Sequence, residues 1–414
     1  MVLAGLTRPR VLGAVLLAAF FARAAACAFL PAPPPEHRGL PNPDNYMRLG
    51  LSLLETGSLL ENDGSWSAER EPVYPGFLAA CLAVRRSARL VQLAQCAVGA
   101  LSVGLLFAFA RRFTGERESL LAAALMAVHP QYLFYAVTPM RETVQAAVVL
   151  VGLLALARAA AAPSARAYLL AGAAAALAPL TNSAFLPWAL GAAPLGILWT
   201  HRFERARALA FAAAFLAAAG PLYGTWVARN YARFGTLVLG ATTGGGGNLY
   251  MYLIVPNDLA GTPEMTRIAE ADPGLRELAA LRLSPVEADR WLYKRALARI
   301  TREPFRFAGL CVGRFFKLWR PIPYKRDYGH SWKLIVAASL ASDAWLIPVA
   351  LAGLFVVGAA SAEAVHLHLF VLSTSAVYAV LWAMVRYRLP MMLAVFILAA
   401  AALTRAWDRA RRPA

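Results

Sequence analysis

The chain has 414 residues, of which 59% are hydrophobic and 15% charged, with a formal net charge of +18. Soluble domains contain about 45–50% apolar and about 25% charged residues, so this composition argues against an ordinary soluble enzyme and against a disordered chain. The four cysteines show no CxxC spacing, which argues against a disulfide framework or a zinc module. Most of the excess charge is arginine beside apolar runs, which orients helices in a bilayer and does not indicate nucleic-acid binding.

Ten apolar segments are long enough to cross a bilayer, which takes about 20 residues. They lie at 11–30, 90–110, 119–139, 142–160, 166–181, 183–200, 208–227, 335–358, 364–385 and 389–404. Pro179 to Ser183 divides a long uncharged stretch, and His129-Pro130 predicts a kink. We therefore predict an all-α polytopic membrane protein, with about ten transmembrane helices in a single membrane domain over 1–414.

Basic loops predict the orientation of these helices. With the N-terminus inside, the inner segments carry fourteen arginines, as the positive-inside rule expects: Arg8, Arg10, Arg111, Arg112, Arg117, Arg158, Arg166, Arg202, Arg205, Arg207, Arg405, Arg409, Arg411 and Arg412. Residues 72–84 are apolar but short, which favours an interfacial or re-entrant piece; a span there would move every later loop to the other side. The arginine and alanine bias is typical of a GC-rich bacterial genome, so we expect a bacterial inner membrane.

Two segments are predicted to be large extracytoplasmic loops. The second, 228–333, carries an amphipathic helix over 287–316 that is broken at Pro304, with basic and aromatic residues alternating as in a headgroup layer. The first, 31–89, is rich in acids, and Asp44 lies there just before a helix-like run. Asp44 could cap that helix, or it could act as a carboxylate at the water–lipid boundary that deprotonates an acceptor hydroxyl.

Several short motifs follow one another in a recognisable order. Asp-x-Tyr, Leu and Gly are followed by Arg-x-Pro-x-Tyr-Pro in the first loop, and three further motifs come later. The matching segments are 43–57, 69–79, 139–146, 226–235 with 243–250, and 386–390. This order resembles bacterial GT-C glycosyltransferases of the family 39 type, which are similar to protein O-mannosyltransferases and to the lipid A aminoarabinose transferase.

The resemblance implies a GT-C fold and an enzyme. That enzyme would be an inverting glycosyltransferase, transferring a hexosyl or pentosyl group from a polyprenyl-phosphate donor to a hydroxyl of a glycan, lipid or protein at the extracytoplasmic face. Asp44 matches the essential acid of the first outer loop and would be the general base, while Arg70, Arg386 and Arg388 would hold the donor phosphate. Some members carry a second acid where this chain has Asn45. A two-acid or divalent-metal mechanism would therefore need another carboxylate, such as Glu69 or Glu71.

The two arginines of 386–390 also stand out without the family. They lie between two apolar runs on the expected outer side, where positive-inside predicts few arginines, and charges at membrane depth are usually paired or functional. Snorkelling into headgroups is the alternative. Polar residues of the same motifs are further candidates for contact with the donor or acceptor: Glu71, Tyr74, Glu142, Arg229, Asn230, Asn248 and Tyr387.

Other functions predict different features. A flippase or transporter of lipid-linked sugars would show an internal repeat or paired broken helices, and the sequence shows neither. A surface-glycan polymerase or ligase is chemically close but uses a diphosphate-linked donor. The glycines 244–247 lack the context of a Walker or Rossmann motif, and His366 and His368, two residues apart, do not share a helix face that could hold a metal. The expected partners are the lipid-phosphate donor, a hydroxyl acceptor and membrane lipids, without nucleic acid.

Overall fold

The computed structural model describes residues 8–29, 36–67, 69–238, 245–256, 259, 262–322 and 332–411. Within these ranges the regular structure is helical, apart from two isolated β-bridges at His37–Leu40 and Leu60–Trp66. Parts of both predicted outer loops, together with Gly244 and Arg412, lie outside the described residues.

Eight helical segments of the described chain are long and apolar enough to cross a membrane. They are α1 (Arg8–Phe29), α4 (Ala88–Ala110), α7 (Glu142–Ala161), the segment 183–200 that ends in α9 (Ala193–Thr200), α10 (Arg205–Phe234), α16 with α17 (Trp332–Leu340 and Asp343–Val357), α18 (Ala362–Val380) and α19 (Leu389–Ala410). The predicted all-α polytopic membrane fold is confirmed.

Two of the ten predicted spans are not among these eight segments. The segment 119–139 consists of α5 (Glu116–Val128) and α6 (Pro130–Val137), which meet at an angle of 53°. The bend falls at His129-Pro130, where proline removes a backbone donor, as predicted. The segment 166–181 contains only α8 (Ala165–Ala176), which ends in turns before Pro179.

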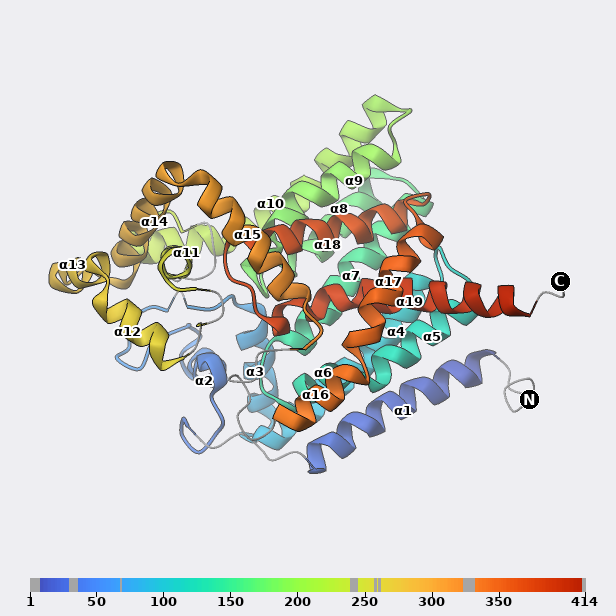
Figure 1. Ribbon diagram of the computed structural model, residues 1–414, viewed down its shortest axis with the longest axis horizontal. Helices are drawn as coiled ribbons and strands as arrows, with labels where there is room; N and C mark the ends of the chain where they lie inside the picture. Colours follow the sequence, from blue (N-terminus) through green and yellow to red (C-terminus); the bar gives the residue numbers. More distant parts are fainter. Residues whose placement is uncertain are drawn as a thin grey trace.

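The start of α1 and the end of α19 lie at one end of the helix bundle, and a group of short helices lies at the other, which we call the loop end (Figure 1). These short helices are α2 (Tyr46–Thr56), α11 (Gly245–Ile254), α12 (Pro263–Ala271), α13 (Pro273–Leu281) and α14 (Pro285–Arg302). From there α15 (Pro304–Trp319) returns toward the bundle, and the break between α14 and α15 falls at Pro304.

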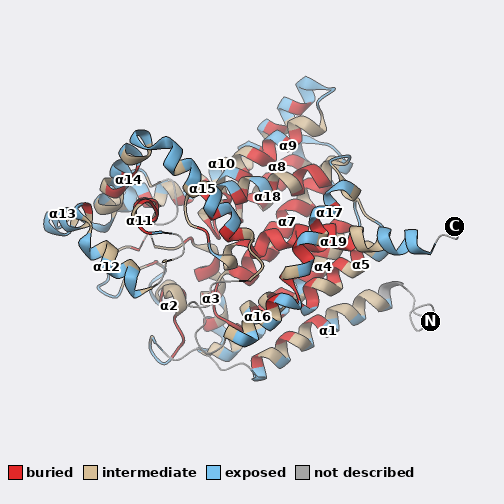
Figure 2. Cartoon of the chain, in the orientation of Figure 1, coloured by how far each residue is buried: buried red, intermediate tan, exposed pale blue. Residues whose placement is uncertain are grey.

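The core of the bundle forms around α7 and α19, which are largely buried, whereas α1 and the loop-end helices are more exposed (Figure 2). Close approaches depend on small residues. A Cβ added to Gly172 of α8 would lie 2.1 Å from the backbone oxygen of Phe215 on α10, and one added to Gly353 of α17 would lie 2.0 Å from that of Leu398 on α19. Backbone contact of this kind is how helices associate in a membrane without a hydrophobic driving force.

One arginine inside the bundle, Arg23, donates its hydrogen bonds partly to the bent span formed by α5 and α6. Arg23 of α1 is fully buried, and its Nη1 donates to the backbone oxygens of Ala19 at 2.9 Å and Ala127 at 3.0 Å. Because α5 stops at His129, the carbonyls of its last turn lack intrahelical partners, and Arg23 supplies a donor. The arginine in the first apolar segment therefore stabilises the bend.

Of the loop-end helices, α2 packs against α3 (Val73–Val84), a twelve-residue apolar helix. At about 1.5 Å per residue it is about 18 Å long, shorter than the roughly 30 Å hydrocarbon layer. This length agrees with the interfacial or re-entrant interpretation of 72–84.

Gly50 allows α2 and α3 to touch. A Cβ at this position would lie 2.7 Å from the Cβ of Leu78, which cannot move without its backbone. We expect Gly50→Ala to destabilise the protein by about 1–3 kcal/mol, the usual cost of overpacking, and to lower the melting temperature in detergent. Gly76→Ala on α3, where a Cβ meets nothing within 4 Å, is the control and should melt like the wild type.

Candidate functional site

Asp44 lies in a 3₁₀ turn, Pro43–Asn45, immediately before α2. The backbone is left-handed at Asp44 (φ 52°) and at Asn45 (φ 62°). The side chain of the N-cap residue Asn45 makes no capping hydrogen bond, and it is Asn42 whose Oδ1 accepts from a backbone N–H in the first turn of α2, that of Arg48. Asp44 therefore does not serve as a helix cap. Its side chain is 34% exposed, and its Oδ2 lies 3.1 Å from Nη2 of Arg386. The turn thus presents a solvent-reachable carboxylate beside an arginine that comes from the other end of the sequence.

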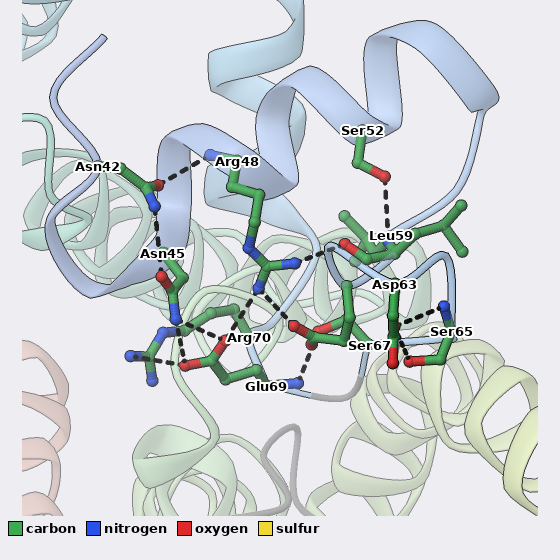
Figure 3. Close-up of polar contacts among 12 residues, drawn as sticks. Asn42, Asn45, Arg48, Ser52, Leu59, Asp63, Ser65, Ser67, Glu69 and Arg70 are labelled. Carbon is green, nitrogen blue, oxygen red and sulfur yellow. Dashed lines mark hydrogen bonds and ion pairs between the residues drawn. The ribbon is translucent and has the colours of Figure 1, made fainter. Parts of the chain in front are cut away.

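A polar network within the first loop holds this turn (Figure 3). Asn42 Oδ1 accepts from the backbone N–H of Arg48, and Asn45 Nδ2 donates to both carboxylate oxygens of Glu69 at 3.1 Å. Arg48, almost fully buried, also contacts Glu69 at 3.2 Å. Arg70 donates from Nε to the backbone oxygen of Asp44 at 3.0 Å, so it fixes the position of the turn directly.

Asn45 therefore contributes an amide, not a second carboxylate, to this site. Glu69, which the sequence offered as a substitute acid, is engaged by Asn45, by Arg48 and, at 3.6 Å, by Arg70. Among the residues that the structure describes, no three His, Cys, Asp or Glu side chains come together in a way that could hold a metal ion.

Arg386 and Tyr387 lie in a second 3₁₀ turn, Val385–Arg388, just before α19. Tyr387 stacks on Tyr378 with ring centroids 5.0 Å apart, and the hydroxyl of Tyr378 accepts a hydrogen bond from Asn182 at 2.9 Å. The Arg386 guanidinium lies 5.1 Å from the ring centroid of Tyr387. Tyr387 thus supports the arginine that faces Asp44.

Glu142 and Glu71 are both buried near this pair, but their surroundings differ. Glu71 accepts from Arg141 at 2.9 Å and from the backbone N–H of Ser183 at 2.6 Å, so it links the first loop to the segment after α8. Glu142 has one carboxylate oxygen without a hydrogen-bond partner, and Arg386 and Arg141 are its main electrostatic neighbours. Glu142 therefore differs from Glu71, both of whose carboxylate oxygens accept hydrogen bonds.

Arg141 lies within the motif segment 139–146 but was not among the predicted site residues. It pairs with Glu71 and is an electrostatic neighbour of Glu142. Burial alone would lower the pKa of its guanidinium, but Tyr46, Glu71 and Glu142 together raise that pKa, so Arg141 is charged. Tyr74 packs behind the site. It is fully buried, its ring meets Tyr46 edge-on at 4.9 Å, and its hydroxyl donates to Gln95.

Arg229 and Asn230 lie beside the first loop without contacting Asp44. Arg229, on α10, donates to the backbone oxygen of Ser67 at 2.8 Å and to Asn230 Oδ1 at 2.9 Å, and its guanidinium lies over the rings of Trp66 and Trp226. Arg229 thus fastens the loop to the bundle. The buried amide nitrogen of Asn230 has no hydrogen-bond partner.

Arg388 points away from Asp44. It is fully buried and pairs with Asp343 of α17, whose other oxygen lies 3.0 Å from Nε2 of His129. The structure therefore separates two arginines that the motif placed side by side. Sequence reasoning missed Asp343, although it is the lone charge in the apolar run 335–358, a usual sign of a paired or functional group.

Asn248 is exposed on α11, and no contact between its side chain and Asp44 is among the described contacts. The backbone N–H groups of the two glycines before it already have an acceptor within the protein. Asp289 Oδ1 accepts from the backbone N–H of Gly246 at 2.8 Å and of Gly247 at 3.1 Å. Burial raises the pKa of Asp289, and these two N–H groups partly offset that rise.

We expect Asp289→Ala to detach the start of α11 from α14. Loss of an acceptor at a helix N-terminus costs about 0.5–2 kcal/mol. Hydrogen exchange at 245–250 should become faster, while exchange in α7 stays unchanged. Asp289→Asn keeps the acceptor oxygen and should behave like the wild type; equal exchange in Asp289→Ala and wild type would contradict the assignment.

Comparisons with known proteins support the resemblance seen in the motifs. Residues 69–223 match the family model of dolichyl-phosphate-mannose-protein mannosyltransferase. No curated protein matches the sequence. The fold matches the crystal structure of the apo oligosaccharyltransferase of Archaeoglobus fulgidus with a TM-score of 0.60 and 14% identity, over 99% of this chain and 51% of that one.

The oligosaccharyltransferase AglB from Archaeoglobus fulgidus, in complex with an inhibitory peptide and a dolichol-phosphate, gives a TM-score of 0.57 and 16% identity over 98% of this chain and 52% of that one. ArnT from Cupriavidus metallidurans bound to undecaprenyl phosphate gives a TM-score of 0.41 and 16% identity, over 96% of this chain and 78% of that one. The chain spans about half the length of the archaeal enzyme. The resemblance to GT-C membrane glycosyltransferases is confirmed, and the chain has their fold.

Proposed function

We propose that this protein transfers a sugar from a polyprenyl-phosphate donor to an acceptor hydroxyl, with inversion, at the extracytoplasmic face of a bacterial inner membrane. The observation that carries the proposal is the Asp44–Arg386 pair at the loop end, which places a reachable carboxylate 3.1 Å from a guanidinium. The family match over 69–223 and the GT-C fold support a glycosyltransferase. The dolichol-phosphate and undecaprenyl phosphate held by AglB and ArnT support the class of donor.

The reaction needs a base and a stabilised leaving group, and the site offers both. Asp44 takes the proton of the acceptor hydroxyl, whose oxygen forms a bond to the anomeric carbon from the side opposite the phosphate. The bond between that carbon and the phosphate oxygen breaks, and the lipid phosphate leaves with the electron pair. Arg386 binds the phosphate oxygens with its planar fork and offsets their growing charge.

The surrounding residues divide the remaining tasks. Arg70 adds a second positive charge next to Asp44, and Glu142 offers its unpaired oxygen to a sugar hydroxyl. The lipid tail of the donor would lie in the bilayer along the apolar helices. The described residues bring together no three His, Cys, Asp or Glu side chains that could hold a metal ion. Asn248 and α11 border the side from which an acceptor would arrive.

The test is donor consumption by the purified protein in lipid vesicles. A panel of polyprenyl-phosphate sugars and a membrane extract as acceptor source are supplied, and each donor and the released polyprenyl phosphate are followed by mass spectrometry. Loss of one donor with matching release of lipid phosphate, absent from protein-free vesicles, supports the transferase. Movement of intact donor across the bilayer without release would indicate a flippase, and consumption only of diphosphate-linked oligosaccharides would indicate a polymerase or ligase.

A further inference from the structure

The turn that carries Arg386 has a second, buried arginine at its end. Arg386 and Arg388 are two residues apart in Val385–Arg388, and they face different surroundings. The Arg386 side chain is 23% exposed and meets Asp44, whereas Arg388 is fully enclosed and meets Asp343. One side of the turn therefore faces the proposed reaction, and the other is embedded in the bundle.

Asp343 is fully engaged at both oxygens. Oδ2 contacts the Arg388 guanidinium, and Oδ1 lies 3.0 Å from Nε2 of His129. Its side chain is 1% exposed, as is that of His129. Removing such charges from water costs several kcal/mol per ion, so a buried pair of this kind is poor evidence for stability. Its geometric effect is the better explanation, because it fixes one orientation of Arg388.

Further contacts fix the same end of the turn. Arg388 also donates to the backbone oxygens of Leu318 and Arg320 at the end of α15, and the hydroxyl of Tyr132 donates to the backbone oxygen of Leu389 at 2.6 Å. The bent span, α15, α17 and the start of α19 therefore meet at 388–389. Tyr387, through its stack on Tyr378, restrains the middle of the same turn.

We propose that Asp343, oriented by His129, is a positioning residue of the transferase: it holds Arg388, fixes the 385–388 turn, and so presents Arg386 to the donor phosphate beside Asp44. This inference rests on the proposed function. Neither Asp343 nor Arg388 touches substrate, so their removal should weaken donor binding more than the chemical step. The family resemblance implied that Arg388 binds the donor phosphate. In this proposal Arg388 instead holds the turn from which Arg386 binds it.

The first test compares Asp343→Asn, Arg388→Gln and the double variant in the donor-consumption assay. A displacement of about 1 Å can reduce catalysis by about 100-fold. We expect kcat/KM for the donor to fall by about 10- to 100-fold, mostly through KM. Because the two residues act through one contact, the double variant should match the more affected single variant; additive losses would overturn the proposal.

Gly172→Ala is the control for general destabilisation. A Cβ at Gly172 would lie 2.1 Å from the backbone oxygen of Phe215, so this change overpacks the contact between α8 and α10, which does not involve the turn. Both Gly172→Ala and Arg388→Gln should lower the melting temperature. Only Arg388→Gln should raise the donor KM, and an equal rise in Gly172→Ala would show that general destabilisation accounts for the effect.

His129 provides a milder variant for the case in which Asp343 or Arg388 cannot be altered without unfolding. His129→Gln retains an N–H donor for Asp343, whereas His129→Leu removes it. We expect the glutamine variant to keep a donor KM close to wild type and the leucine variant to raise it. The same donor KM in both would overturn the role of His129.

Hydrogen exchange separates this inference from the proposed function. The amides of 385–389 should exchange faster in Asp343→Asn and stay unchanged in Gly172→Ala. Unchanged exchange in Asp343→Asn overturns the positioning role, whether or not the wild type transfers sugar. Absence of donor consumption by the wild type overturns the proposed function, while faster exchange would still show that Asp343 fixes the turn.

Discussion

Asp44→Asn should abolish sugar transfer while leaving the protein folded. Asparagine has the size of aspartate and tolerates the left-handed backbone, so the turn should form as before. It cannot act as a base, and general-base catalysis typically contributes about 10²–10⁴-fold to the rate. We therefore expect kcat with the consumed donor to fall by about that factor. The melting temperature and the affinity for undecaprenyl phosphate, measured separately, should stay close to wild type.

Asp63→Asn is the control for the first loop. Asp63 is also an acid of this segment, but its carboxylate accepts only from Ser65 in an exposed turn. Its turnover should equal that of the wild type. If Asp44→Asn retained more than about a tenth of wild-type kcat, a loss smaller than general-base catalysis predicts, Asp44 would not be the base.

Arg386→Gln should weaken the binding of the donor. A hydrogen bond to a charged group contributes about 1.5–3 kcal/mol, and about 1.4 kcal/mol corresponds to a factor of ten. We expect the donor KM to rise by about 10- to 100-fold, and Arg386→Lys to recover part of the loss, because lysine keeps the charge without the planar fork. Steady-state kinetics over a range of donor concentrations measures both.

The control for this change is Arg267→Gln on α12, whose guanidinium makes an exposed pair with Glu264. Such surface pairs contribute little, so its kinetics should not change. An unchanged donor KM in Arg386→Gln would remove Arg386 from phosphate binding. The pairing of Arg386 with Asp44 also means that the two substitutions should not combine additively.

Hydropathy and the order of short motifs predicted much of this molecule. Runs of apolar residues located the spans, because a membrane helix needs its whole length to be apolar. The break at His129-Pro130 could be predicted because proline acts locally. Asp44 and Arg386, far apart in the sequence, were selected by resemblance, and the fold brings together the turns before α2 and α19 that carry them.

The orientation of individual side chains could not be predicted from the sequence. Nothing in Arg-Tyr-Arg-Leu-Pro distinguishes the arginine that meets Asp44 from the one that meets Asp343, because the difference comes from the turn and its neighbours. The hydrogen-bond partner of the glycines at the start of α11 could not be predicted either. Their free N–H groups resemble an anion site, and the acceptor that occupies them, Asp289, is distant in the sequence.

The left-handed backbone of the Asp44 turn lowers thermal stability at the residue that the proposed activity requires. Two consecutive residues other than glycine hold φ values of 52° and 62°, a conformation that costs about 1–3 kcal/mol per residue. Asp44→Gly would release that strain, and we expect it to melt at a higher temperature than the wild type while lacking the carboxylate. A library of variants screened only for thermal resistance should therefore accumulate glycine at this position and lose the activity with it.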